Sequence, residues 1–276
     1  MTEQIIAQRL GIALRQVQGT VRLLRDGATI PFISRYRKEA TGSLDELQVG
    51  AVKEQLDKLT ELEARKQTVL STIGEQGKLT DELRKRIEAC WEAVELEDIY
   101  LPYKPKRRTR ATVARERGLE PLANSIMAQH SHDIARQAQR FVTADVPTPE
   151  EAIAGACDII AERVSEDERA RNSVRRTAAR EGAVHSRLVK GKEQEGVKYS
   201  DYFDAASPLR TVSSHRFLAM RRGMDEGVLK ISVEMDADRI TEGLCRQFVR
   251  HGSATREWME AAVADSFKRL IRPSIE

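Results

Sequence analysis

The sequence predicts a mainly α-helical protein with a small β element near residues 184–235. Only 16 glycines and 8 prolines occur among 276 residues, so few positions interrupt a helix. Apolar residues recur at spacings of three and four along most of the chain, which is the period of an amphipathic helix. The clearest exception is Leu229 to Met235, where apolar and polar residues alternate as in a strand. We therefore expect a multi-helix array with one long helix and a small sheet.

Residues 1–42 predict three short helices that end at Gly11, Gly27 and Gly42. Thr29 can cap the third helix, which has a proline near its start and contains two aromatic residues. Three short helices with glycine joints are compatible with a helix-turn-helix unit, although any small helical cluster has the same pattern.

Residues 43–182 predict a long helix followed by a helical core. Ser43 and Glu46 have the spacing of a capping box, so the Ser43 hydroxyl is expected to accept a backbone N–H at the start of the long helix. The apolar stripe continues to about Gly74. A second capping box, Thr148 to Glu151, predicts another strong helix.

Residues 183–276 predict a mixed segment. Strands are expected at 184–190 and 229–235, and helices near 213–220, 238–251 and 253–270. The segments 1–42, 43–182 and 183–276 are the three domains that the patterning predicts, and the second contains a basic loop at 102–117.

The chain carries no apolar run of about 18 residues and no basic, then apolar, leader after Met1. This predicts a cytoplasmic protein with no membrane partner. The three cysteines, Cys90, Cys157 and Cys245, each fall on or beside an apolar helical stripe. Buried structural thiols are therefore expected rather than a disulfide framework or a zinc site.

Common catalytic and nucleotide-binding signatures are absent from the sequence. The chain has no GxGxxG, GxxxxGK[ST], GxSxG or HExxH pattern. His130 and His132 form the only close histidine pair and lie at a predicted polar helix end. The acidic clusters 95–98 and 166–168 suit structural roles, although either has the composition to bind a divalent ion. The sequence thus predicts no enzyme activity, no cofactor and no metal site.

A concentrated basic segment is the first candidate site. Seven cations and one carboxylate lie between Lys104 and Arg117, a local charge of +6, so the rest of the chain sums to −3. Two prolines, Pro102 and Pro105, favour a loop at its start. The residues expected to contact phosphates of RNA or DNA are Lys104, Lys106, Arg107, Arg108 and Arg110. The alternative is an internal clamp, in which these cations pair with carboxylates such as the 95–98 cluster.

A second candidate is formed by Arg35, Arg37 and Lys38 on the third short helix. In a true helix-turn-helix these side chains would face a groove or the phosphate backbone. In a simple helical cluster they would face solvent or pair with Asp45 and Glu46.

Three long stretches then carry a family resemblance. They are Thr29 to Gly42, Glu95 to Arg110, and Val189 to Gly196 followed by Tyr202-Phe203 and Ser214-His215-Arg216. Together they resemble the amino-terminal half of the bacterial Tex family of transcription accessory proteins. The resemblance implies helix-turn-helix-like elements around a long central helix. It also implies that family members continue with resolvase-like, helix-hairpin-helix and OB-fold modules, and that this chain ends before all three.

Taken together, the residues and the resemblance predict a non-enzymatic amino-terminal scaffold that binds nucleic acid, RNA or DNA, through the basic loop. The alternative is a protein–protein interaction module that engages the transcription machinery and uses the loop as an internal clamp.

Overall fold

The computed structural model describes residues 1–105, 107–130 and 133–276. The chain folds as two compact units, Met1–Lys104 (unit 1) and Pro105–Glu276 (unit 2). The prediction of a mainly α-helical chain with a small β element is confirmed. The boundary between the units falls inside the predicted segment 43–182, so that segment contributes to both.

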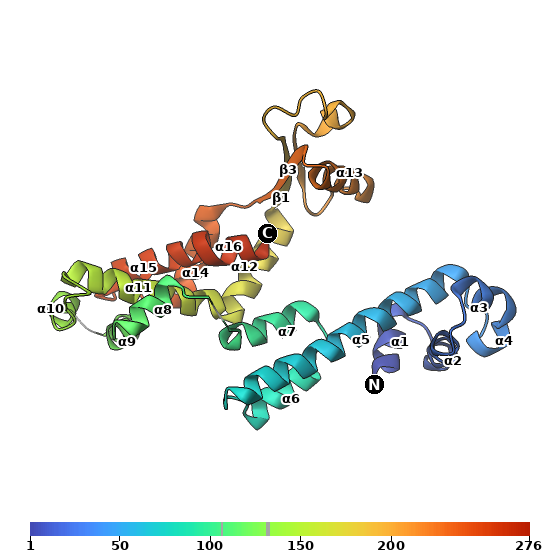
Figure 1. Cartoon of the computed structure of the whole chain (residues 1–276), viewed down its shortest axis with the longest axis horizontal. Helices are drawn as coiled ribbons and strands as arrows, with labels where there is room; N and C mark the ends of the chain where they lie inside the picture. The colour runs from blue at the N-terminus through green and yellow to red at the C-terminus, as the bar shows by residue number, and fades with distance from the viewer. Residues whose placement is uncertain (106, 131–132) are drawn as a thin grey trace. The chain divides into compact units, whose positions relative to one another are not determined.

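Unit 1 is organised along one 30-residue helix, α5 (Glu46–Glu75). Three of the four short helices that precede this helix pack on it, the fourth packs on two of those three, and the two helices that follow it also contact it (Figure 1). A short 3-10 turn, η1 (Leu101–Tyr103), ends the unit. The other helices are α1 (Thr2–Leu10), α2 (Leu14–Arg25), α3 (Ile30–Tyr36), α4 (Lys38–Thr41), α6 (Asp81–Ala89) and α7 (Ala93–Tyr100).

The start of α5 lies two residues later than its sequence pattern predicts. Asp45 is the N-cap: its carboxylate accepts the backbone N–H of Gln48 at 2.8 Å, and the Gln48 side-chain oxygen accepts the N–H of Asp45 at 3.1 Å. Ser43 instead has a φ of +67°, in the left-handed region, and cannot occupy the extended cap position. The apolar stripe of α5, from Val52 to Ile73, is buried against the neighbouring helices as predicted.

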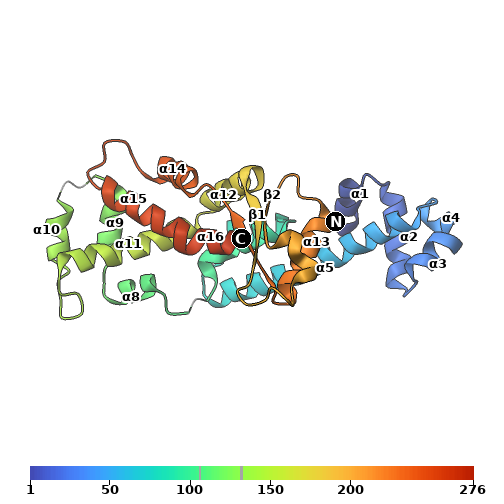
Figure 2. The ribbon, with the colours of Figure 1, turned by 90° about the horizontal axis from the view of Figure 1, so that it is seen from above.

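Unit 2 is built around α11 (Pro149–Glu166), which Thr148 caps by accepting the N–H of Glu151 at 3.2 Å. This cap is the one that the sequence predicts. Figure 2 shows α15 running alongside α11, and α8 and α9 also pack on it. The helices of this layer are α8 (Arg110–Glu116), α9 (Glu120–Ala128), α10 (Ile134–Gln139), α12 (Glu168–Glu181), α14 (Ala237–Phe248), α15 (Arg256–Asp265), a π-helical continuation η3 (Ser266–Ile271) and α16 (Arg272–Ile275).

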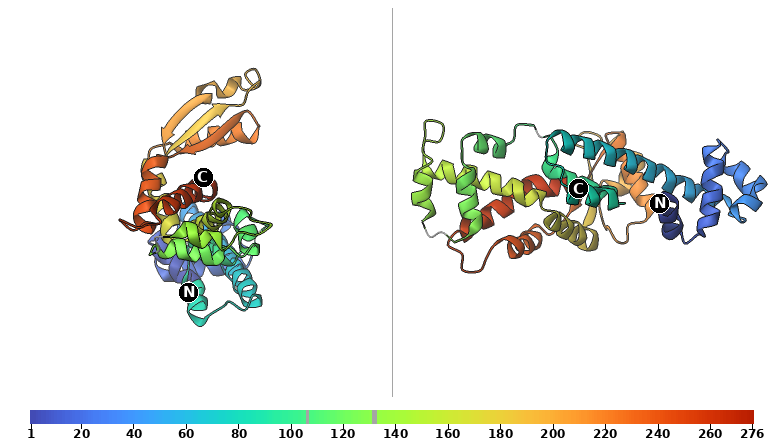
Figure 3. Two further views of the ribbon diagram at one scale, coloured as in Figure 1. Left: turned by 90° about the vertical axis from the view of Figure 1, so that its left-hand side faces the viewer. Right: turned by 90° about the horizontal axis from the view of Figure 1, so that it is seen from below.

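A three-stranded antiparallel sheet of order β2-β1-β3 follows α12, with α13 (Ser214–Asp225) packed against β3 (Figure 3). The strands are β1 (Ala183–Leu188), β2 (Asp204–Pro208) and β3 (Leu229–Glu234), and a 3-10 segment, η2 (Val197–Tyr202), precedes β2. Ser186 of β1 pairs with Ala205 on one side and Ile231 on the other. The two outer strands are also joined through His185, whose ring nitrogens lie 2.7 Å from Asp204 and 2.7 Å from Glu234.

Candidate nucleic-acid interface

The basic loop begins at the end of unit 1. Tyr103 of η1 is partly buried, and its carbonyl oxygen accepts a hydrogen bond from Nε2 of Gln76 at 2.8 Å. This bond ties the end of the unit to the residue that follows α5. Lys104 comes next, is exposed, and forms no ion pair with the described residues. Its charge therefore projects from a backbone position that the fold holds in place.

Within unit 2, the carboxylate of Glu162 on α11 anchors the start of α8. One Glu162 oxygen accepts Nη1 of Arg115 at 2.6 Å, and the other accepts the hydroxyl of Thr109 at 3.1 Å. The same hydroxyl accepts the backbone N–H of Thr112 at 3.0 Å and so caps α8. The Glu162 side chain is only 8% exposed, which makes these bonds well shielded from solvent. The first turn of α8 is thus fixed against α11.

Three predicted phosphate ligands lie around this anchored turn and are exposed: Arg107, Arg108 and Arg110. Arg108 pairs with Glu116 at 2.8 Å, but these side chains are 71% and 52% exposed. Exposed pairs of this kind contribute about 0–1 kcal/mol, so a polyanion can replace Glu116 at little cost. Arg107 and Arg110 form no ion pair within the described residues. The remaining predicted ligand, Lys106, lies outside the described residues.

The positive charge of Arg110 also acts on Asp158, a carboxylate of α11. Burial raises the pKa of Asp158, while the positive charges of Arg269 and Arg110 act in the opposite direction. Arg269 donates to Asp158 at 2.9 Å, so it is the direct partner of that carboxylate. Arg110 acts only at longer range and keeps its hydrogen-bond donors available.

In the acidic cluster at 95–98, which the clamp alternative offers as a partner, Glu97 is paired inside unit 1. Glu97 accepts Nε of Arg65 at 2.6 Å and its Nη2 at 3.1 Å, and this hydrogen bond raises the pKa of Arg65. Asp98 is buried and has an interaction partner of its own. Among the described residues, Arg115 of the basic segment forms a clamp of this kind, with Glu162 of α11.

The second candidate group lies in unit 1. Arg35 lies in the last turn of α3, Arg37 joins α3 to α4, and Lys38 begins α4; all three are exposed. Nη1 of Arg37 lies 3.8 Å from Glu39, between side chains that are 48% and 69% exposed. Arg35 and Lys38 form no ion pair with the described residues. The structure therefore brings these three cations together, whereas the basic loop divides between the end of unit 1 and the start of unit 2.

Two aromatic residues beside this group were not predicted as site residues. Phe32 is 40% exposed and Tyr36 is 68% exposed, and their ring centroids are 5.6 Å apart with an interplanar angle of 43°. The guanidinium carbon of Arg37 lies 5.5 Å from the centroid of Phe32. The available sequence signal was the spacing of four between the rings, which places them on one face of the helix.

The comparisons with known proteins cover both units. The domain described as "Tex-like protein N-terminal domain" matches residues 1–74, and "Tex central region-like" matches residues 129–276, more than half of the chain. The chain belongs to the Tex family. The resemblance stated from the sequence is therefore confirmed. The α3–α4 cations lie inside the Tex amino-terminal match, and the basic loop falls between the two Tex matches.

The individual relatives of this Tex-family chain are longer proteins than the chain itself. It is 46% identical over 235 residues to the "Transcriptional accessory protein Tex" of Neisseria gonorrhoeae, covering 85% of this chain and 31% of that protein. It is 45% identical over 273 residues to "Protein YhgF" of Escherichia coli, covering 97% and 35%. A weaker similarity, 27% over 285 residues, is to the human "S1 RNA-binding domain-containing protein 1", covering 98% and 28%. The chain spans about a third of the length of these relatives.

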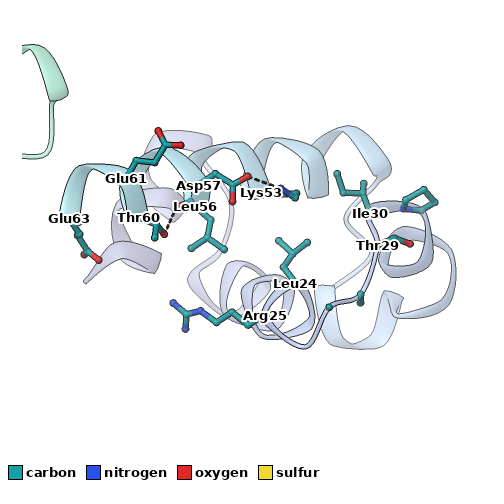
Figure 4. A pocket seen from close by; sticks show the side chains of 13 residues that line it. Leu24, Arg25, Thr29, Ile30, Lys53, Leu56, Asp57, Thr60, Glu61 and Glu63 are labelled. Atoms are coloured by element: carbon teal, nitrogen blue, oxygen red, sulfur yellow. Dashed lines mark hydrogen bonds and ion pairs between the residues drawn. The ribbon is translucent and has the colours of Figure 1, made fainter. Parts of the chain in front are cut away.

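A hollow in unit 1 of this Tex-family chain lies between α5 and the loop joining α2 to α3 (Figure 4). It is open, with a volume of about 980 Å³. Leu24, Ile30 and Leu56 face its interior, and the Lys53–Asp57 ion pair, 2.6 Å, lies on its rim. Its 13 lining residues include no histidine or cysteine, so it offers neither of those two groups for acid–base or nucleophilic chemistry.

The cysteines of the Tex-family chain are poor nucleophiles in this fold. Burial raises the pKa of Cys157 to about 11 and also raises the pKa of Cys90 and Cys245. All three thiols are therefore protonated near neutral pH, and the thiolate is the reactive form. Within the described ranges, no three His, Cys, Asp or Glu side chains are grouped to hold a metal. No helix among these residues combines the length and apolarity needed to cross a membrane.

Proposed function

We propose that this chain is the non-enzymatic amino-terminal scaffold of a transcription accessory protein that binds RNA or DNA, with the basic loop contacting phosphates. One observation carries the proposal: Lys104, Arg107 and Arg110 are exposed and have no ion-pair partner among the described residues, while neighbouring Arg115 is tied to Glu162. Hydrogen bonds hold Tyr103 before the loop and Thr109 near its end, and these three cations stay available. The names of the Tex and S1 relatives support a role in transcription and RNA binding.

The energetic basis is the release of counterions from the nucleic acid. Each phosphate that a Lys or Arg neutralises contributes about −0.9 to the slope of log affinity against log salt for a duplex, and about −0.7 for a single strand. The five predicted loop cations would therefore give a slope of roughly −4 to −5 on a duplex.

The test is a salt titration of RNA and DNA binding by fluorescence anisotropy. The loop variant carries four substitutions: Lys104→Gln, Arg107→Gln, Arg108→Gln and Arg110→Gln. We expect its salt slope to be shallower by roughly 3 on a single strand and 3.6 on a duplex, with a matching loss of affinity.

A matched control variant also loses four positive charges, but from exposed i,i+4 ion pairs outside the loop: Lys53→Gln, Lys58→Gln, Arg246→Gln and Arg256→Gln. It controls for net charge and is expected to keep the slope of the natural sequence. Equal affinities and slopes for the loop variant and the natural sequence would remove the proposal.

The alternative function, a protein-interaction module engaging the transcription machinery, is supported by the Arg115–Glu162 ion pair, which ties one residue of the basic segment to α11. It predicts that the four loop substitutions lower the melting temperature markedly. The phosphate-contact proposal predicts little change in melting temperature, since the substituted side chains are exposed.

A further inference from the structure

The aromatic pair on α3, Phe32 and Tyr36, belongs to none of the hydrophobic clusters found among the described residues. α3 is held to the rest of unit 1 by Ile33, which is fully buried with Leu44 and Val49. Phe32 and Tyr36 are not part of that cluster and leave 40% and 68% of their surface in water. We call Phe32, Tyr36 and Arg37, together with the flanking Arg35 and Lys38, the α3 platform.

The α3 platform combines ring faces with positive charge. The two rings lie side by side at 5.6 Å, and the Arg37 guanidinium carbon is 5.5 Å from the Phe32 centroid. Arg35 and Lys38 are neighbours of the rings in sequence and are exposed, and the carboxylate of Glu39 lies 3.8 Å from Arg37. Aromatic faces with neighbouring arginines and lysines are the surface on which proteins stack bases and follow a phosphate backbone.

We propose that the α3 platform stacks an unpaired base of a single-stranded nucleic acid while Arg35 and Lys38 contact the adjacent phosphates. A base inside a duplex has both faces covered by its neighbours, so exposed rings have nothing to stack on there. The excess of positive charge favours a polyanion over a protein surface as the occupant. The inference rests on the proposed function and assigns it a strand preference that the basic loop alone does not supply.

The test uses the full chain with two labelled probes, an oligouridylate of about 16 nucleotides and a duplex of the same length. Phe32→Leu and Tyr36→Leu, singly and together, keep a helix-compatible apolar side chain and remove the ring. Val94→Ala is the matched control, because Val94 is a 55% exposed apolar residue of unit 1 on another helix. Circular dichroism and the melting temperature verify that each variant folds.

We expect each ring substitution to weaken single-strand binding at least about fivefold, with the duplex affinity and the salt slope unchanged. An unchanged slope is the signature of a lost stack, since the phosphate contacts remain. In a single strand that carries 2-aminopurine, emission should be quenched on binding, and the double ring variant should restore it.

Other outcomes overturn the inference. Ring variants that bind the single strand as tightly as the natural chain would show that the α3 platform is not a stacking surface and would leave a protein partner as its occupant. Equal losses on single strand and duplex would refute the strand preference. Failure of the natural chain to bind either probe would instead refute the proposed function itself, so the two failures are distinguishable.

Discussion

Replacing Gly19 by alanine tests how closely α2 and α4 must approach to form the amino-terminal cluster. A Cβ at Gly19 would lie 2.1 Å from the carbonyl oxygen of Ala40 on α4. Real Cβ atoms stay beyond 3.0 Å, so the two helices would have to separate by at least 0.9 Å. The obstacle is backbone, which cannot rotate aside as a side chain can.

The magnitude follows from two opposing effects. Glycine to alanine within a helix ordinarily gains up to about 1 kcal/mol. Overpacking costs about 1–3 kcal/mol, and a backbone obstacle places this site at the upper end. We expect Gly19→Ala to lower the free energy of unfolding by about 2 kcal/mol. Gly50→Ala, at a position in α5 with no atom within 4 Å of the added Cβ, should raise it by about 0.5–1 kcal/mol.

The assay is urea unfolding followed by tryptophan emission. The chain has two tryptophans, Trp91 in unit 1 and Trp258 in unit 2. In a Trp258→Phe background, Trp91 therefore reports the unit that holds both glycines. Finding Gly19→Ala as stable as Gly50→Ala would show that the close approach of α2 and α4 is not required, and the reasoning would be wrong.

Two further predictions concern buried charges. Glu162→Gln should lower the free energy of unfolding by about 1–3 kcal/mol, because it removes the shielded carboxylate that lies 2.6 Å from Arg115 and leaves that arginine only the more distant Glu120, at 4.0 Å; adding Arg115→Met should restore part of that loss, and no recovery in urea unfolding would contradict the clamp. Lys66 is buried, and its ammonium lies 3.7 Å from the centroid of the Trp91 ring; burial lowers its pKa from 10.5. Between the lowered pKa and 10.5 the unfolded chain binds a proton that the folded chain does not, so the free energy of unfolding should rise with pH in that window. This rise should be smaller in Lys66→Met, and parallel pH profiles for the two proteins would refute it.

Several features of the fold could be predicted because they depend on residues close together in the chain. Thr148 caps α11 as expected, since the cap and its acceptor are three residues apart. β1 and β3 were anticipated from short apolar patterns, whereas β2, Asp204–Pro208, has too little apolar alternation to signal a strand and exists because it pairs with β1. The cap of α5 was assigned to Ser43 rather than Asp45, because spacing alone does not show which residue adopts the extended backbone.

In the candidate sites too, some features follow from the local sequence and others depend on tertiary packing. The sequence by itself determined the helical architecture, the Tex-family membership and the concentration of cations at 104–117, since periodicity, motifs and charge are written along the chain. Only the tertiary structure decided that Arg115 is tied to Glu162, 47 residues away, while Arg107 is not, and that Ile33 is buried while Phe32 and Tyr36 stay in water. Ion-pair choice and burial depend on which distant segments pack together, and a local pattern does not contain that information.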